Sequence, residues 1–426
     1  MSISSLSKTQ KEAIYSVEDG DNIFITGSAG TGKSFLLQYL KRNYLSSGLH
    51  VTASTGIAAI NVGGQTIHSW SGIGLGNIPI SQLIQNFSSV KFSQLRKRIR
   101  MANMLAIDEI SMISAHSFDL LNELFKNIRR NDKAFGGLQI ILFGDFFQLP
   151  PITRYNEAMD NNYNFCFQSK AWEELNLKNF ILKDAFRQKD LNFVRLLENI
   201  RFGKIDNEAI DILKSRFQII DQNPAIKPTI LVTHNQQMES INEASLKNIP
   251  EKSHFFEASY KGNAKKIEAL RKNCLAQENL ELKIGCQVMM LKNTYQKDGI
   301  INGSLGVVQG FTLKRNYPIV KFKNGAILTI APEEWALEKY NQEKEELIKE
   351  AKMVQIPLIP SWAITVHKSQ GMTLDKIKCN LSNSFSEGQI YVALSRVKTL
   401  EGLFIDGLDV NKIKANNEVI KFYQNL

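Results

Sequence analysis

The segment NIFITGSAGTGKSFLLQYLKRNYL, residues 22–45, decides the fold of this chain. It begins with an apolar run that predicts a buried strand and ends with apolar residues at helical spacing. Between them the chain reads Gly27-Ser28-Ala29-Gly30-Thr31-Gly32-Lys33-Ser34, which fits the pattern G-x-x-x-x-G-K-[ST] without deviation. A strand, a glycine-rich turn and a helix in this order are the context in which that pattern wraps a phosphate chain. The sequence therefore predicts a nucleotide site in an α/β domain.

Each residue type in this loop suits phosphate binding. The glycines let backbone N–H groups turn toward phosphate oxygens, and the start of the following helix adds a positive dipole. Lys33 is expected to place its ammonium group against the β- and γ-phosphates, and the Ser34 hydroxyl is expected to complete a magnesium shell. The expected cofactors are therefore ATP and Mg²⁺.

Two further apolar runs end in residues suited to nucleotide hydrolysis. The run MLAI at residues 104–107 leads into Asp108, expected to bind magnesium, and Glu109, expected to polarise the attacking water. A third run, LQIILFGD at residues 138–145, precedes Gln148, which is expected to contact the γ-phosphate or that water. An Asp-Glu pair is common on surfaces, so its position at the end of a buried strand is what favours function. Gln148, followed by two prolines, also fits an ordinary loop, and the two preceding motifs are what favour function there.

The wider pattern predicts an α/β fold class with parallel sheets. Apolar runs separated by helical patterns imply strands that carry ligands at their C-terminal edge. A second set of such runs appears at residues 179–184, 228–233 and 362–366. Short β-runs rich in Gly and Asn between about 285 and 324 predict a small antiparallel barrel with a tight Asn-Gly hairpin. Residues 332–352, rich in Glu and Lys at helical spacing, predict an exposed helix.

Composition narrows the class of protein. No run of about 18 apolar residues suggests a membrane span, and the first twenty residues lack the apolar core of a secretory signal. The four cysteines lie far apart without zinc-ligand spacing, as expected for reduced thiols in a cytoplasmic protein. A net charge of +10 favours a polyanionic partner, although a solvated surface explains the same excess.

The motifs occur in an order that resembles a known helicase family. They are GSAGTGKS, ASTGIAAINVGGQTIHS, IDEISM, GDFFQLPPI, AFRQ, AITVHKSQGMTLD and GQIYVALSRVKTLEGL. In this order and spacing they are similar to superfamily-one helicases of the petite-integration-frequency (PIF) type. The resemblance covers nearly the whole chain, and the last two motifs separate this family from generic phosphate-loop ATPases.

The resemblance implies two RecA-like domains, a wedge insertion in the first and a small, Src-homology-like β-barrel inserted in the second. The first domain is expected at residues 1–180 with the wedge at about 65–90, and the second at 181–284 and 357–426. The barrel and the exposed helix are expected at 285–356. The implied activity is ATP-dependent 5′-to-3′ movement on single-stranded DNA, with unwinding of duplexes and G-quadruplexes. The expected partners are single-stranded DNA and its junctions with duplex DNA. The protein is expected to be a monomer and to have no membrane partner.

The resemblance also assigns further nucleotide contacts. Arg187 and Arg396 match family positions that reach the γ-phosphate from the second domain, where an arginine contributes about 10³–10⁵ in rate. Gln10 matches the adenine-reading glutamine, since an amide both donates to and accepts from an adenine edge. A capping serine followed by an exposed glutamine explains the same residues nearly as well. Gly371 is expected to allow a close turn at this site.

Small and polar residues after other strands suit a grip on the DNA backbone. In the first domain these are Ser54, Thr55 and Gly56, followed by His68, which is available to stack on bases, and Trp70 as a second candidate. A lone His or Trp is more often packed inside the protein, so that alternative stays open. Stacking is worth about 1–3 kcal/mol per base and tolerates any sequence. In the second domain the expected DNA contacts are Thr233, Asn235, Thr365, His367 and Lys368.

Other interpretations stay open at this point. A protein-remodelling ATPase would explain Lys33 and the Asp-Glu pair but would leave the segments TASTGIAA and VHKSQG without a role. A passive nucleic-acid-binding protein conflicts with the intact nucleotide motifs, and a RecD-like or relaxase-type helicase with the missing nuclease or relaxase residues. The basic run at residues 91–100 is interpreted as a solvated helix rather than a DNA patch. Residues 72–89 give no independent sign of strand separation.

Overall fold

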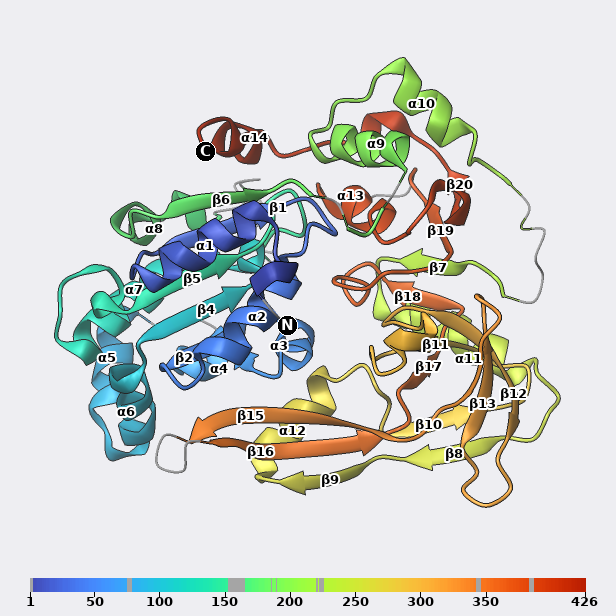
Figure 1. Ribbon diagram of the computed structural model, residues 1–426, viewed down its shortest axis with the longest axis horizontal. Coiled ribbons are helices and arrows are strands. Elements are labelled where there is room, and N and C mark those ends of the chain that lie inside the picture. The colour runs from blue at the N-terminus through green and yellow to red at the C-terminus, as the bar shows by residue number, and fades with distance from the viewer. Residues whose placement is uncertain are drawn as a thin grey trace. The chain divides into compact units, whose positions relative to one another are not determined.

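The computed structural model describes residues 3–74, 79–151, 165–184, 186–188, 190–219, 221, 226–341, 346–382 and 387–426. The chain forms two compact units. The first unit contains Met1–Phe186, Leu337–Glu350 and Asn417–Leu426, and the second contains Arg187–Ala336 and Ala351–Asn416. Each unit has its own parallel sheet, and this confirms the predicted α/β class (Figure 1).

The first unit is built on a six-stranded sheet in the order β3-β2-β4-β5-β1-β6. Every pairing between neighbouring strands is parallel, so all six C-terminal ends meet at one edge. The strands are β1 (Ile23–Gly27), β2 (Leu49–Ala53), β3 (Gln65–Thr66), β4 (Met104–Asp108), β5 (Gln139–Phe143) and β6 (Lys178–Leu182).

Helices cover this sheet because alternate strand residues are apolar on both faces. Ile23 and Ile25 of β1 share one buried cluster with apolar residues of α1 and α2, while Phe24 packs against Phe146 and Trp172. Helices α5, α6 and α7 contact one another, and α7 also contacts α8 (Figure 1). The helices of this unit are α1 (Lys8–Glu18), α2 (Lys33–Tyr44), α3 (Gly56–Asn61), α4 (Ile67–Ser71), α5 (Ile80–Ser88), α6 (Ser93–Met101), α7 (Ala115–Arg129), α8 (Lys170–Glu174) and α14 (Asn417–Gln424).

The second unit contains a four-stranded parallel sheet in the order β18-β7-β19-β20. Its strands are β7 (Thr229–Val232), β18 (Ala363–Thr365), β19 (Ile377–Asn380) and β20 (Leu403–Gly407). The helices are α9 (Leu191–Arg201), α10 (Asn207–Lys214), α11 (Asn235–Lys247), α12 (Ala264–Asn273) and α13 (Gln389–Leu394).

An antiparallel sheet is inserted into the second unit, as the Gly- and Asn-rich runs predicted. Its order is β14-β13-β12-β11-β17, and the expected Asn-Gly turn joins β13 to β14 with Gly325 at φ +91°. The strands are β11 (Gln287–Met290), β12 (Leu305–Phe311), β13 (Pro318–Phe322), β14 (Ile327–Thr329) and β17 (Leu358–Pro360). A two-stranded sheet of β8 (His254–Glu257) and β10 (Asn279–Leu282) adds Leu280 and Leu282 to the same core.

The prediction of an exposed helix at residues 332–352 is wrong. The segment forms strands β15 (Glu333–Asn341) and β16 (Glu346–Gln355). Together with β9 (Ser259–Gly262) they form a three-stranded sheet in the order β15-β16-β9. Alternate residues are buried in each strand, Trp335 and Leu337 in β15, and Ala351 and Met353 in β16. Burial of these side chains and pairing with β9 outweigh the helix propensity of Glu and Lys, which is at most a few tenths of a kcal/mol per residue.

Two smaller interpretations also need correction. The run at residues 179–184 was grouped with the second set of strands, but β6 pairs with β1 at the edge of the first sheet. The basic run is not simply a solvated helix, because Arg98 donates to the carbonyl of Trp70 and Arg96 to that of Phe87. Buried carbonyls at the ends of helices need donors, and these guanidinium groups supply them. Within the predicted wedge, residues 75–78 lie outside the described residues.

Among the described residues, no helix combines the length and the apolar character needed to cross a membrane.

Candidate functional site

The phosphate loop connects β1 to α2 with a positive φ at Gly27, Gly30 and Gly32, a backbone conformation that favours glycine. Gly27 has φ +151°, and a Cβ there would lie 2.4 Å from the carbonyl oxygen of Leu182. Gly32 has φ +89°, and a Cβ there would lie 2.7 Å from Nε2 of Gln10. The loop is therefore held close to its neighbours, and its amides remain at the start of a twelve-residue helix.

Lys33 lies at the first position of α2 and folds back over the loop. Its Nζ donates to the carbonyl of Gly27 at 2.6 Å and to that of Ser28 at 3.0 Å. Thr31 is buried and donates its hydroxyl to the Ser28 carbonyl at 2.9 Å, which closes the loop on itself. Ser34, the next helical residue, is exposed. The loop therefore brings a cation and a hydroxyl to one helix start, as the sequence predicted.

The paired carboxylates lie at the end of β4, in the same sheet. Glu109 adopts a left-handed conformation at φ +53°, and its amide donates to Oδ1 of Asp108 at 2.9 Å. Burial, and then the charge of Glu109, raise the pKa of Asp108 to about 7, while the Glu109 amide and Lys33 act in the opposite direction. Removal of a carboxylate from water disfavours its charged form, so a nearby divalent cation would stabilise this group.

The Gln148 loop follows β5, the strand between β4 and β1. Gln148 is buried, its amide donates to the Asp145 carbonyl at 2.9 Å, and its Nε2 lies 3.5 Å from Oδ2 of Asp145. Asp145 is fully buried and also accepts from the phenol of Tyr423 at 3.3 Å. The three predicted hydrolysis motifs therefore end neighbouring strands β4, β5 and β1.

Gln10 caps a helix and contacts the phosphate loop at the same time. Ser7 and Gln10 form a reciprocal capping box at the start of α1. Gln10 is nevertheless buried, not exposed, and its Nε2 donates to the Gly32 carbonyl at 3.4 Å. The capping interpretation is therefore correct in its bonds and wrong in its exposure. Reading of adenine by Gln10 stays a prediction.

These groups fit ATP and Mg²⁺. The glycine cradle leaves no room for side chains, and the Ser34 hydroxyl and the Asp108 carboxylate are oxygen ligands of the kind that Mg²⁺ prefers. Among the described residues, no group of three or more His, Cys, Asp or Glu side chains would hold a metal by itself. An ion bound with one carboxylate and one hydroxyl would complete its shell from phosphate oxygens and water, which is the usual form of a Mg–nucleotide site.

Arg187 and Arg396 lie close together in the second unit. Nη1 of Arg187 donates to the Ser395 carbonyl at 3.0 Å, while Nε of Arg396 donates to the Val392 carbonyl at 2.8 Å. Arg396 is only 1% exposed. Burial, and then the charge of Arg396, lower the pKa of Arg187 to about 9. Two neighbouring guanidinium groups repel each other, so an anion placed beside them would be stabilised.

Gly371 meets a backbone requirement of the second unit. Its φ is +78°, and a Cβ there would have no heavy atom within 4 Å. Conformation and not space therefore favours glycine at this turn. A contact of Gly371 with nucleotide stays a prediction.

The predicted DNA residues of the first unit follow two neighbouring strands, β2 and β3. Two of them have partners within the protein: the Ser54 hydroxyl donates to the Glu109 carbonyl at 2.8 Å, and the Thr55 hydroxyl caps α3, which begins at Gly56. His68 is half-buried in α4, and burial lowers the pKa of its imidazole, so a neutral ring is available for stacking. Ser54 therefore links this loop to the carboxylate pair.

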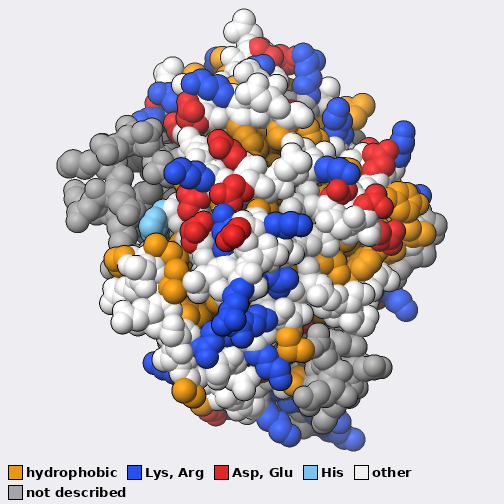
Figure 2. Space-filling model, turned by 90° about the vertical axis from the view of Figure 1, so that its left-hand side faces the viewer, with side chains coloured by type: hydrophobic (Ala, Val, Ile, Leu, Met, Phe, Trp, Pro, Cys, Tyr) orange, Lys and Arg blue, Asp and Glu red, His pale blue; other side chains and the backbone are white. Residues whose placement is uncertain are grey.

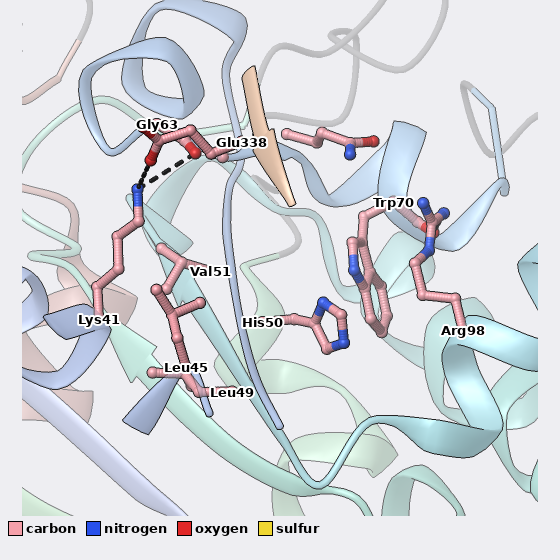
Figure 3. A pocket seen from close by; sticks show the side chains of 11 residues that line it. Lys41, Leu45, Leu49, His50, Val51, Gly63, Trp70, Arg98 and Glu338 are labelled. Atoms are coloured by element: carbon pink, nitrogen blue, oxygen red, sulfur yellow. Dashed lines mark hydrogen bonds and ion pairs between the residues drawn. The ribbon is translucent and has the colours of Figure 1, made fainter. Parts of the chain in front are cut away.

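The proposed stacking of Trp70 on bases is wrong. Trp70 is 3% exposed and packs against Phe125, with the imidazole of His50 at 5.2 Å and the guanidinium of Arg98 at 5.3 Å. Figure 3 shows His50, Trp70 and Arg98 among the side chains that line a small cavity, which has a volume of about 40 Å³. A large apolar ring in a helix is more stable inside the core than in water, and the sequence pattern could not show which way it pointed.

Substitutions of Trp70 and His68 are therefore expected to affect different properties, stability for Trp70 and DNA binding for His68. Trp70→Ala is expected to lower the free energy of unfolding by about 3–5 kcal/mol because it empties a packed site. His68→Ala is expected to weaken binding of single-stranded DNA by about 1–3 kcal/mol with little change in stability. Chemical denaturation and fluorescence anisotropy with a labelled oligonucleotide measure the two quantities. A loss of DNA affinity in folded Trp70→Ala protein would contradict the core assignment.

The predicted DNA residues of the second unit gather at the edge formed by β7 and β18. Thr233 follows β7, and Asn235 begins α11 with an exposed side chain. Thr365 is buried, and its hydroxyl accepts from the Lys368 amide at 3.2 Å, so it shapes the turn. His367 and Lys368 are half-buried, and burial lowers the pKa of each. A direct DNA contact by any of these residues stays a prediction.

Sequence reasoning missed two polar groups of this site, the buried Asp145 and the half-buried Tyr423. Asp145 ends an apolar run and is the first residue of the segment DFFQ, so its position after a strand was a usable signal. Tyr423 lies nearly 300 residues away in α14, and nothing local marks it as a neighbour of the site.

Charge is unevenly distributed over the surface. Figure 2 shows one face on which several Lys and Arg side chains cluster below the centre, while other Lys and Arg side chains are scattered and Asp and Glu side chains lie mainly above the cluster. A local cluster of cations of this kind attracts polyanions.

The fold and the site together define a phosphate-loop nucleotide-binding protein with a second parallel α/β unit. The sequence model of the PIF1-like helicase family matches residues 5–211, and that of the DNA helicase Pif1 2B domain matches residues 267–311. The chain belongs to the PIF1-like helicase family.

The similarity to known proteins covers nearly the whole chain. The ATP-dependent DNA helicase PIF1 of Danio rerio is 38% identical over 423 residues, which are 99% of this chain and 64% of that protein. The chain thus spans less than two thirds of the length of that relative. The Pif1 of a Bacteroides species in complex with ADP-AlF4 is 31% identical, with a TM-score of 0.85 and coverage of 99% and 96%. A Bacteroides Pif1 in complex with ADP-AlF3 and single-stranded DNA is 31% identical, with a TM-score of 0.65 and coverage of 99% and 97%.

Proposed function

We propose that this chain is an ATP-dependent DNA helicase that moves 5′-to-3′ along single-stranded DNA and unwinds duplexes and G-quadruplexes. The observation that carries the proposal is the convergence of Lys33, Asp108 and Gln148 at the ends of three neighbouring strands. Membership of the PIF1-like family supports the DNA substrate. The relative solved with both ADP-AlF3 and single-stranded DNA supports the pairing of nucleotide and strand.

The nucleotide site divides its work among few residues. Lys33 and the loop amides bind phosphate oxygens, while Ser34 and Asp108 would hold Mg²⁺. Mg–ATP, when bound, supplies a phosphoryl group whose developing charge requires cations around it. Glu109 accepts a proton from water, and Gln148 orients that water. Arg187 and Arg396 are proposed to stabilise the γ-phosphoryl charge.

The DNA grip is proposed to avoid base readout. Thr55, Gly56, Thr233 and Asn235 offer amides and short polar side chains to phosphates, and Lys368 adds one cation. His68 stacks on bases whatever their identity. A grip of this kind lets a monomer pass along every sequence.

The decisive measurement is ATP turnover with and without a single-stranded oligonucleotide. We expect at least a roughly tenfold rise in turnover with DNA, since the strand assembles the complete site. High turnover without stimulation would instead indicate a protein-remodelling ATPase, and no turnover a passive DNA-binding protein. Duplexes with only a 5′ or only a 3′ tail then test direction. Unwinding restricted to the 3′-tailed duplex would contradict the proposed polarity.

A further inference from the structure

The phenol of Tyr423 lies where two nucleotide motifs of the first unit meet. Its oxygen is 2.6 Å from Oγ1 of Thr26, which directly precedes the phosphate loop. The same oxygen accepts from the Phe146 amide at 3.2 Å and donates to Oδ1 of Asp145 at 3.3 Å. A phenol offers one donor and two acceptor positions, so acceptance from Thr26 completes its hydrogen bonding.

Aromatic packing fixes the helix that carries this phenol. The neighbouring Phe422 stacks on Phe167 with ring centroids 4.3 Å apart and meets Phe146 edge-on at 5.4 Å. The ring of Tyr423 itself stacks on Phe147 at 4.8 Å. Several large rings must therefore move together before the phenol can leave its place.

The hydrogen bonds continue from Tyr423 to Gln148. Oδ1 of Asp145 accepts a hydrogen bond from the Tyr423 phenol, and Oδ2 of Asp145 lies 3.5 Å from Nε2 of Gln148. The Asp145 carbonyl also accepts from the Gln148 amide at 2.9 Å. A single hydroxyl thus connects the strand before the phosphate loop with the loop that carries Gln148. Since Asp145 is fully buried, loss of one partner cannot be replaced by bulk water.

Helix α14 follows the second unit in sequence but belongs to the first unit. The second unit ends at Asn416, and Asn417–Leu426 belong to the first unit. The segment that holds the Gln148 loop is therefore also the covalent continuation of the second unit.

We propose that Tyr423 is a positioning residue that sets the Gln148 loop relative to the phosphate loop, so that the γ-phosphate is recognised. This inference rests on the proposed nucleotide function. Tyr423 does not touch the nucleotide in this proposal but acts through Asp145 and Gln148. ADP lacks the γ-phosphate, so its binding does not depend on this connection.

Tyr423→Phe is the direct test, because it keeps the ring and removes only the hydroxyl. We expect kcat for DNA-stimulated ATP hydrolysis to fall roughly three- to tenfold, the range for loss of one hydrogen bond. The preference for a non-hydrolysable ATP analogue over ADP is expected to fall by a similar factor, with ADP affinity within about twofold of the parent. Stopped-flow or calorimetric binding and steady-state turnover measure these quantities.

Tyr44→Phe is the matched control. It removes a phenol of the same unit that donates to Glu18 at 2.6 Å and lies at the opposite end of α2 from Lys33. The proposal fails if Tyr423→Phe matches Tyr44→Phe in kcat and in analogue preference. It also fails if ADP and analogue affinity fall together, since the phenol would then only support the loop.

A double-mutant cycle with Gln148 tests the route. If Tyr423 acts through Gln148, Gln148→Ala and the double variant should lose analogue preference equally, because the first change already removes the side chain that the phenol positions. Additive losses would overturn the route. Lys33→Ala separates this inference from the proposed function: if hydrolysis survives that change, the nucleotide assignment itself fails.

Discussion

Replacement of Arg396 by alanine is expected to lower DNA-stimulated ATP hydrolysis by about 10³–10⁵, the contribution of a cation that meets the transferring phosphoryl group. Binding of ATP is expected to persist, because the phosphate loop and Lys33 remain intact. The comparison of turnover with equilibrium nucleotide binding distinguishes the two steps. Near-normal turnover in this variant would refute the role of Arg396.

The structure adds a requirement to this experiment. Arg396 is buried, and its side chain donates to the Val392 carbonyl and to the Ser395 hydroxyl at 2.9 Å. Alanine removes both of these hydrogen bonds, although the Val392 carbonyl still accepts from the Ser395 hydroxyl at 2.9 Å, so stability must be measured beside activity. Arg216→Ala is a suitable control because Arg216, also in the second unit, donates to the carbonyls of Leu403 and Glu401. If both variants lose equal stability, only Arg396→Ala should lose turnover.

Replacement of Lys33 by alanine is expected to lower ATP hydrolysis by about 10²–10³, the effect of removing one preorganised stabiliser of developing charge. Unwinding should be lost in parallel. Binding of single-stranded DNA without nucleotide should change by less than about twofold, because Lys33 donates to the Gly27 and Ser28 carbonyls of the phosphate loop and is not among the proposed DNA contacts. Turnover, unwinding and anisotropy assays measure the three effects.

Lys41→Ala supplies the control on the same helix. Lys41 donates to the carbonyl of Val62. It also donates to the carbonyl of Gly63 and forms an ion pair of 3.1 Å with Glu338 (Figure 3). Its loss should affect local stability and leave turnover near that of the parent. Equal losses of turnover in both variants would show that the effect is not specific to the phosphate-binding lysine.

Local patterns predicted those parts of the site that depend on neighbours in sequence. The phosphate loop requires glycine at fixed positions, and the strands before Asp108 and Gln148 are continuous apolar runs that only a buried parallel sheet accommodates. Helix propensity failed at residues 332–352, where the burial of Trp335 and Leu337 and the pairing with β9 determine a hairpin. The prediction that Trp70 stacks on bases failed for a similar reason, because the sequence does not show whether an aromatic side chain lies in the core or on a DNA-binding surface.

By itself, the sequence determined the class of the nucleotide site, its chemical groups and the parallel sheets that carry them, because these follow from residue types at short, fixed spacing. Only the tertiary structure decided which polar groups meet: Ser54 at the Glu109 carbonyl, Arg187 beside Arg396, and Tyr423 between Thr26 and Asp145. Contacts between residues hundreds of positions apart depend on how packed elements bury their apolar faces. No local spacing records that arrangement.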